Sequence, residues 1–321
     1  MIFRGIVLLV SVTIFMTGCH QKEEPPVRLA LVEWAGYAPL YVAEAKGWLP
    51  GNVRIVDFTS NYDIKEGIKF GTIHVAALTL DEAITLRQET PLRVHYFLDC
   101  SDGADKVMAA EAFADLRALR GRRVAYEPDS VQAYLLARAL SLNGLGFDDI
   151  TAVPLKGHDL LSAWQKGEFD AVSVYEPLAT RLKKTGMHSV FDSGDIPAEI
   201  IDTLIVTESY AKKIPATLHA LIRAWNRGVA ALENDPEALQ LAAKRLHLSV
   251  AKLKTIYSQI KLMACKDNVE MTQNGAKHFT QIVQTVNTTL LGQKRLRSAE
   301  KPYELSGFTA LQRTCEEESS P

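Results

Sequence analysis

Residues 27–48, VRLALVEWAGYAPLYVAEAKGW, decide the fold. They open with a short apolar run, residues 27–32, that predicts a buried strand. A helix is expected over residues 39–48, because Pro39 suits a first helical turn and Gly47 lies near the end. A strand that leads directly into a helix is the repeating unit of α/β proteins.

The same unit repeats along the next part of the chain. Repeated strand–helix order implies a mostly parallel sheet flanked by helices. There are two such runs of roughly a hundred residues each, which indicates two similar lobes. Strands are predicted at 53–58, 73–78, 92–98, 122–126, 150–155 and 171–175, with helices at 63–70, 79–88, 129–142, 159–166 and 177–184.

The pattern changes near Thr203. One more strand, 204–207, is followed by helices predicted at 215–232, 236–246, 249–262 and 272–291. The chain has no low-complexity linker between the lobes, so we expect it to cross twice between them. The predicted domains are 27–100 for the first part of lobe 1, 101–202 for lobe 2, 203–313 for the helical return to lobe 1, and 314–321 for a flexible tail.

The N-terminus is typical of an exported lipoprotein. Arg4 precedes an apolar stretch of about eleven residues, which suits a signal peptide and is too short to span a bilayer. Cys19 directly follows Gly18, so residues 1–18 are expected to be removed and Cys19 to carry lipid, with 19–26 as a tether. The protein would be held on a membrane in the periplasm or at the cell surface. Plain secretion and an uncleaved anchor are the alternatives.

Composition excludes several classes of protein. Lys plus Arg number 36 against 38 for Asp plus Glu, so nothing suggests a nucleic-acid partner. The three cysteines besides Cys19 form no CxxC pair, which excludes a common kind of zinc site. At most one intramolecular disulfide can form among Cys100, Cys265 and Cys315. Cys265 with Cys315 is the first pairing to test.

Polar and aromatic side chains follow the ends of several predicted strands, where α/β proteins bind ligands. The candidate ligand-binding residues are Trp34, Gly36, Tyr37, Thr79, Asp81, Ser101, Gly103, Ser130, Tyr175, Glu176 and Asp202. Most of them also have a structural interpretation. These are packing for Trp34 and Tyr37, a turn for Gly36, first-turn helix charges for Asp81 and Glu176, a helix cap for Ser130 and a hinge turn at 101–103.

The acidic candidates indicate what kind of ligand would fit. Asp81, Glu176 and Asp202 would be costly to bury in one cleft without partners. A cationic or amine-bearing ligand, or a heterocycle with N–H donors between Trp34 and Tyr37, would satisfy them. A simple oxyanion would be repelled. A zwitterion with its anionic end on a helix N-terminus also fits.

Five stretches of the chain, taken in order, resemble one known group of proteins. They are 32–48 (VEWAGYAPLYVAEAKGW), 80–83 (LDEA), 99–105 (DCSDGAD), 119–126 (LRGRRVAY) and 167–177 (GEFDAVSVYEP). They are similar to the nitrate/sulfonate/taurine and thiamine-precursor (SsuA/TauA-like) branch of periplasmic substrate-binding proteins of ABC importers. The resemblance implies a two-lobed type II binding-protein fold with a helical C-terminal region. It also implies a monomer that closes on a small molecule and delivers it to the transmembrane subunits of an ABC permease.

The sequence contains no set of residues that predicts catalysis. GxSxG, HExxH and P-loop motifs are absent, and no metal or cofactor is expected. Pyrimidine-precursor synthases resemble the same binding proteins, but they need a cysteine cluster that this chain lacks. The remaining alternative is a sensory or accessory lipoprotein that binds a solute and docks to a receptor.

Overall fold

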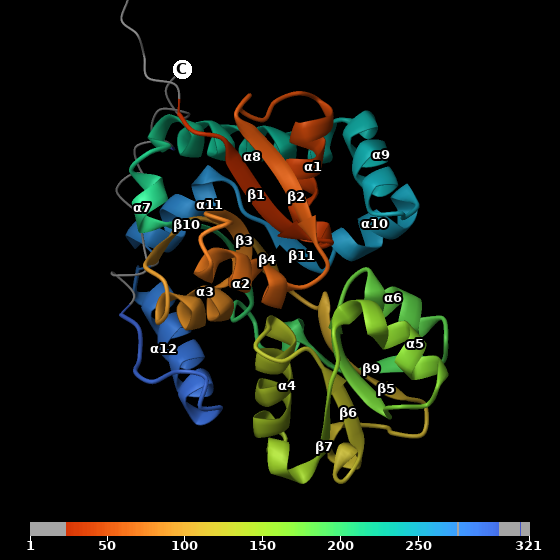
Figure 1. Cartoon of the computed structure of the whole chain (residues 1–321). Coiled ribbons are helices and arrows are strands. Elements are labelled where there is room, and N and C mark those ends of the chain that lie inside the picture. Colours follow the sequence, from red (N-terminus) through yellow and green to blue (C-terminus); the bar gives the residue numbers. More distant parts are fainter. Residues whose placement is uncertain (1–23, 275, 302–314, 316–321) are drawn as a thin grey trace, which may run out of the picture.

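The computed structural model describes residues 24–274, 276–301 and 315. Figure 1 shows two bodies, each built around one sheet. We call the body with the six-stranded sheet lobe 1 and the body with the five-stranded sheet lobe 2. This confirms the prediction of a two-lobed α/β fold with helices flanking both sheets. The predicted signal peptide and Cys19 lie outside the described residues.

Lobe 1 takes its sheet from two distant parts of the chain. Strands β1, β2 and β3 are parallel, whereas β10 runs antiparallel to both β3 and β4 and lies between them. The returning segment therefore enters the middle of the sheet. The spatial order is β11 (Ile260–Leu262), β4 (Leu92–Ser101), β10 (Ile201–Thr207), β3 (Val75–Thr79), β1 (Val27–Val32) and β2 (Val53–Phe58).

Lobe 2 is formed by one continuous segment. Its strands β7, β6 and β8 are parallel, with β7 at the edge of the sheet, and β5 runs antiparallel to β8 and β9. The sequence did not predict β5, because the charged residues Asp105 and Lys106 open it although both are buried. The spatial order is β7 (Thr151–Pro154), β6 (Arg123–Tyr126), β8 (Ala171–Tyr175), β5 (Asp105–Ala110) and β9 (Met187–Asp192).

Helices cover the faces of both sheets (Figure 1). In lobe 1, α1 packs on α8, and Gly228 of α8 allows the two backbones to approach, because a Cβ there would overlap Pro39. The helices are α1 (Ala38–Ala45), α2 (Asn61–Lys69), α3 (Leu80–Arg87), α4 (Val131–Leu142), α5 (Leu160–Gln165), α6 (Leu178–Lys183), α7 (Glu208–Ala211), α8 (Pro215–Asn234), α9 (Pro236–Arg245), α10 (Val250–Tyr257), α11 (Cys265–Val269) and α12 (Ala276–Gly292). Within the described part of the chain, none of these helices is long and apolar enough to cross a membrane.

The predicted helix over 249–262 was wrong at its end. α10 stops at Tyr257, and residues 260–262 form β11, which pairs with the end of β4. The backbone N–H of Asp102 also donates to the carbonyl of Gln259 at 2.8 Å. Pairing with an open strand edge in the folded protein thus prevails over the local helical pattern.

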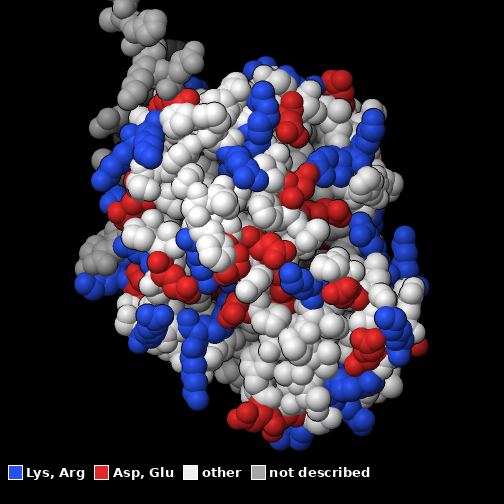
Figure 2. All heavy atoms as spheres, viewed as in Figure 1, with Lys and Arg blue, Asp and Glu red and all other residues white. Residues whose placement is uncertain are grey.

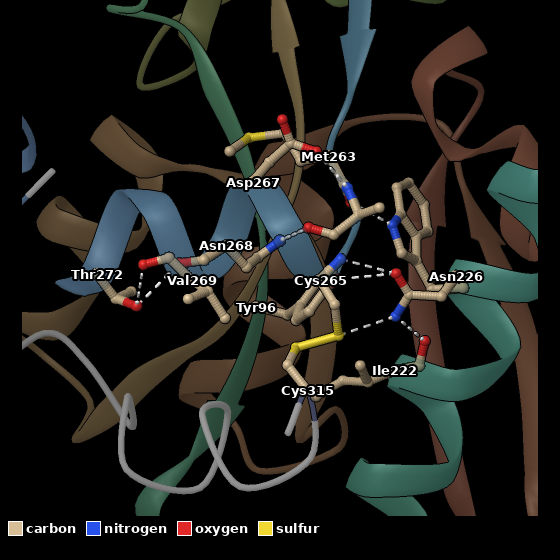
Figure 3. Close-up of a disulfide and its surroundings, with 12 residues drawn as sticks. Tyr96, Ile222, Asn226, Met263, Cys265, Asp267, Asn268, Val269, Thr272 and Cys315 are labelled. Carbon is tan, nitrogen blue, oxygen red and sulfur yellow. Dashed lines mark hydrogen bonds between the residues drawn. A yellow bond between two sulfur atoms is a disulfide. The ribbon is translucent and has the colours of Figure 1, made fainter. Parts of the chain in front are cut away.

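Cys265 and Cys315, named from the sequence as the first pairing to test, form a disulfide. The disulfide joins the start of α11 to a residue near the C-terminus (Figure 3). Cys265 is also held by Asn226 of α8, whose side-chain oxygen accepts from the Cys265 N–H at 2.9 Å. Cys315 is buried, so the tail predicted over 314–321 is fixed at this residue.

Removing the disulfide should destabilise lobe 1. It closes a loop with a sequence separation of 50 residues, and for that length the loss of unfolded-state entropy contributes about 3–4 kcal/mol. We expect the double variant C265S/C315S to lose about that much free energy of unfolding in urea titrations. A reductant should destabilise the wild type and leave the double variant unchanged. Equal stability of the oxidised wild type and the variant would contradict the assignment.

Candidate ligand-binding cleft

Two short links join the lobes. The chain leaves β4 at Ser101 and enters β5 at Asp105, and it returns from β9 to β10 through residues 193–200. The links are bonded to each other: the hydroxyls of Ser101 and Ser193 lie 2.8 Å apart, and the N–H of Gly103 donates to the Ser193 hydroxyl at 2.7 Å. Gly103 has a φ of 101°, which only glycine adopts readily. Ser101 and Gly103 thus take part in the link between the lobes.

A cleft of about 490 Å³ lies between the lobes. Its volume is in the range of pockets that hold small molecules. Acidic side chains gather along the boundary between the two bodies in the view of Figure 2. Lobe 1 contributes Val32, Glu33, Asp57, Phe58, Thr59 and Arg245, and lobe 2 contributes residues that include Glu127, Gln132, His158, Leu161, Tyr175 and Arg181.

A second, inner cavity of about 20 Å³ also has walls from both lobes, and Val32 and Tyr175 line both spaces. It is about the size of one water molecule. We refer to the two as the outer cleft and the inner cavity. The inner cavity is lined by Trp34, Tyr37, Thr79, Tyr175 and Asp202, all named from the sequence, together with Val32, Asn61, Asp105 and Val131.

Trp34 and Tyr37, the two aromatic residues named from the sequence, donate hydrogen bonds to carboxylates of the protein itself. Trp34 Nε1 donates to both carboxylate oxygens of Asp99, at 3.3 and 3.2 Å, and the Tyr37 hydroxyl donates to Asp202. The rings are only 4% and 2% exposed. The Trp34 ring also meets Tyr175 of lobe 2 edge-on, with centroids 5.7 Å apart. Both side chains are therefore part of the packed wall at the inner end of the interlobe space.

Asp99 and Asp202 form a buried acid pair. They are opposite each other on the antiparallel strands β4 and β10. Burial raises the pKa of Asp99 to about 8, against the lowering effect of the Trp34 hydrogen bond. Burial and the nearby Asp99 also raise the pKa of Asp202 well above its usual value. A neighbouring buried acid, Asp105, has its pKa raised to about 7 by burial. The pair therefore retains at least one proton at neutral pH.

Gly36 is required by this arrangement. A Cβ at this position would overlap the Asp99 carboxylate and the Trp34 indole nitrogen. The residue thus permits the close approach of the first turn to β4, which agrees with its structural interpretation.

A further buried carboxylate, Glu82, links the lobes. Glu82 is 0% exposed and lies in the first turn of α3, where its Oε2 accepts from the Thr79 N–H at 3.2 Å. Its Oε1 accepts from the Asn61 amide at 2.9 Å and, across the lobe boundary, from the Val131 N–H at 3.2 Å. The N-terminus of α4, an expected anion-binding position, is thus occupied by a carboxylate of lobe 1.

Three further candidates have local bonds at helix starts. Asp81 accepts from the Thr79 hydroxyl at 2.7 Å, and Glu176 accepts from the Thr180 N–H at 3.0 Å. The Ser130 hydroxyl accepts from the Gln132 N–H at 3.1 Å as the N-cap of α4. These contacts are those of caps and first-turn charges. None of the three side chains lines the outer cleft or the inner cavity.

The sequence did not single out several residues that the structure places between the lobes: Asn61, Asp99, Asp105, Glu127 and Gln132. Asp99 and Glu127 do follow predicted strands, at 92–98 and 122–126, so their positions at strand ends were the available signal. Among the described residues, no group of three or more His, Cys, Asp or Glu is placed to hold a metal ion.

Two lobes joined by two links, with a cleft lined from both sides, define a type II periplasmic substrate-binding protein fold. The sequence model described as NMT1/THI5 like matches residues 34–239, and the chain belongs to this family.

Comparison with curated proteins supports the nitrate/sulfonate/taurine branch of periplasmic substrate-binding proteins. The taurine-binding periplasmic protein of Escherichia coli is 24% identical over 170 residues, which cover 52% of this chain and 53% of that protein. A putative aliphatic sulfonates-binding protein of Bacillus subtilis is 21% identical over 245 residues, covering 70% of this chain and 73% of that protein. The chain thus matches about half the length of the first of these relatives.

Solved structures share the fold over nearly the whole chain. The periplasmic aliphatic sulphonate binding protein SsuA from Escherichia coli has a TM-score of 0.69 and 19% identity, covering 90% of this chain and 99% of that one. The periplasmic nitrate-binding protein NrtA from Synechocystis PCC 6803 has a TM-score of 0.76 and 13% identity, covering 93% and 90%. Periplasmic binding proteins of the nitrate/sulfonate/taurine type are therefore the relatives of this chain, as predicted.

The buried acids predict a loss of stability as the pH rises. A carboxyl whose pKa is raised by folding contributes stability that is lost as pH rises through the folded-state pKa. For Asp99 and Asp105 that loss extends to about pH 8 and pH 7. Burial lowers the pKa of His95 to about 4. This histidine therefore makes the protein more stable as the pH rises, but only up to about pH 6.5. We therefore expect the free energy of unfolding to fall by about 2–3 kcal/mol between pH 6.5 and 8.5.

The variant to compare is D99N, which keeps an acceptor for the Trp34 N–H and removes one ionisable carboxyl. Denaturant titrations across the same pH range should show a flatter profile for D99N. The exposed residue Asp148 provides the control D148N, which should retain the wild-type slope. A wild-type profile that is flat or rises with pH would contradict the assignment.

Proposed function

We propose that this protein captures a small solute between its lobes and delivers it to the transmembrane subunits of an ABC importer. The observation that carries the proposal is the outer cleft of about 490 Å³, whose walls come from both lobes. A solute bound there contacts both walls at once and so favours the closed arrangement over the open one. No bond has to be made or broken, and we place the protein among binding proteins, without a cofactor.

The contacts across the cleft suit reversible closure. Arg181 of lobe 2 meets Glu33 of lobe 1 at 3.1 Å, and Lys156 of lobe 2 meets Asp63 of lobe 1 at 3.3 Å. All four side chains are partly exposed, and such ion pairs contribute about 0–1 kcal/mol each. They orient the lobes and still allow them to separate.

The division of the chain is part of the proposal. Residues 27–100 and 203–313 would form lobe 1, and residues 101–202 lobe 2, so that the links near Ser101 and Ile201 act as the hinge. The protein would act as a monomer. Lipid on Cys19 would hold it on the membrane in the periplasm or at the cell surface, near its permease.

The solutes in the names of the relatives limit the classes of ligand to test. Their names refer to taurine, aliphatic sulfonates and nitrate. For this chain we propose a small polar solute from a set that comprises sulfonates, taurine-like zwitterions and amine-bearing heterocycles of the thiamine-precursor kind.

Ligand binding should raise the melting temperature, because a solute that binds only the folded state stabilises it. We expect at least one compound of a panel of aminosulfonates, alkanesulfonates, aminopyrimidines and polyamines to shift it by several degrees at about 100 times its Kd. Uptake of that compound by cells should require this protein together with a permease. Binding without any effect on uptake, together with co-purification of a receptor, would indicate sensing and contradict delivery.

The lipid anchor is tested separately. In cells that produce C19S, the full-length protein should move from the membrane fraction to the soluble fraction, because the thiol that accepts the lipid is lost. C100S is the matched control and should remain with the membrane. Membrane attachment of C19S equal to that of the wild type would contradict lipidation at this residue.

A further inference from the structure

One carboxylate in the wall of the outer cleft has an oxygen without a hydrogen-bond partner among the described residues. Glu127 lies in the loop between β6 and α4, lines the outer cleft and is 6% exposed. Its Oε1 has no hydrogen-bond partner among the described residues, and it makes no ion pair with them. A buried carboxylate oxygen without a donor is costly. A ligand that brings a donor to Oε1 removes that cost.

Gln132 stands beside Glu127 on the same wall. It is 4% exposed and also lines the outer cleft. Its amide oxygen lies 2.7 Å from the Ser130 hydroxyl, and its Nε2 has no partner within the described part of the chain. Two buried polar atoms from one loop and helix start thus lack hydrogen-bond partners in the wall of the outer cleft.

The positive charges in the outer cleft are already neutralised. Arg181 is paired with Glu33, and Arg245 with Asp57. On the lobe 1 side, the buried ammonium of Lys65 donates to the carbonyl of Asp129 and does not line the cleft. Glu127 is therefore the carboxylate of this wall that makes no ion pair with the described residues, and the nearby Lys65 ammonium only partly opposes burial, which raises the pKa of Glu127 to about 7.

The start of α4 offers no free N–H group to an oxyanion at its first two positions. The first two N–H groups of α4 are bound to the Glu82 carboxylate and the Ser130 hydroxyl, at 3.2 and 3.1 Å. An anion at this helix start would displace a buried carboxylate and lie close to Glu127 as well. The N–H groups at this helix start, which would usually attract an anion, are thus already bound to groups of the protein.

We infer that the solute captured in the outer cleft carries a protonated amine, or a nitrogen heterocycle with a charged N–H donor, that binds Glu127 with Gln132 beside it. The inference rests on the proposed function of solute capture and names its ligand class. A sulfonate or nitrate without such a nitrogen is excluded as the preferred cargo.

The test uses two matched pairs of probes with the full chain in detergent. The first pair is an aminomethyl-substituted aminopyrimidine and its hydroxymethyl counterpart, and the second is taurine and ethanesulfonate. Each pair differs by one amine. Calorimetric titration should give at least tenfold tighter binding for the amine member of at least one pair, and E127Q should abolish that preference. E168Q, which alters an exposed carboxylate of lobe 2 outside the outer cleft, is the control and should keep the preference.

The outcomes separate this inference from the proposed function. Tight binding of ethanesulfonate, with taurine no better and E127Q without effect, would support capture and overturn the ligand class. Native mass spectrometry of the protein isolated from its own cells provides a measurement that needs no variant. A bound solute that contains a basic nitrogen supports the inference, and a bound solute without nitrogen overturns it. Failure of both amine probes to bind also overturns it.

Discussion

The contact between the two lobes depends on the hydrogen bonds that one buried carboxylate, Glu82, accepts. Glu82 accepts from the backbone at the start of α3, from the Asn61 side chain of α2 and from the backbone at the start of α4. Three elements from two lobes thus share one charged group that water does not reach. Because each oxygen has a donor, its burial is compensated. The same contact gives lobe 2 a neutralised helix start and leaves the wall of the cleft acidic.

Much of this arrangement was predictable because it is local. The apolar run and the helix start in residues 27–48 place Trp34 and Tyr37 after β1, and the structure finds both at the inner cavity. Thr79 and Asp202 also lie there, at a strand end and at a strand start. Strand order and chain direction are enough to bring such positions to one edge of a sheet.

The direction of each side chain was not predictable, because it depends on which donor lies nearest. Asp81 and Glu176 hydrogen-bond to groups two and four residues away and so have their carboxylates at helix starts, where Asp81 also pairs with Arg295 at 3.6 Å. Asp99 faces Asp202 only because β4 and β10 pair in one register, although about a hundred residues separate them in the chain. Asp105 and Lys106 concealed β5 for a similar reason: charged residues at the link are buried in the tertiary structure.

The position of β10 also constrains the order in which the molecule can assemble when its chain becomes available from the N-terminal end. In the sheet of lobe 1, β10 lies between β3 and β4. Lobe 2 is built from the uninterrupted segment of chain between β4 and β10. Lobe 2 can therefore complete its sheet before lobe 1. In lobe 1, the edges of β3 and β4 that pair with β10 stay unpaired until the chain is available up to residue 207. Those edges are the surface on which a holding chaperone would act.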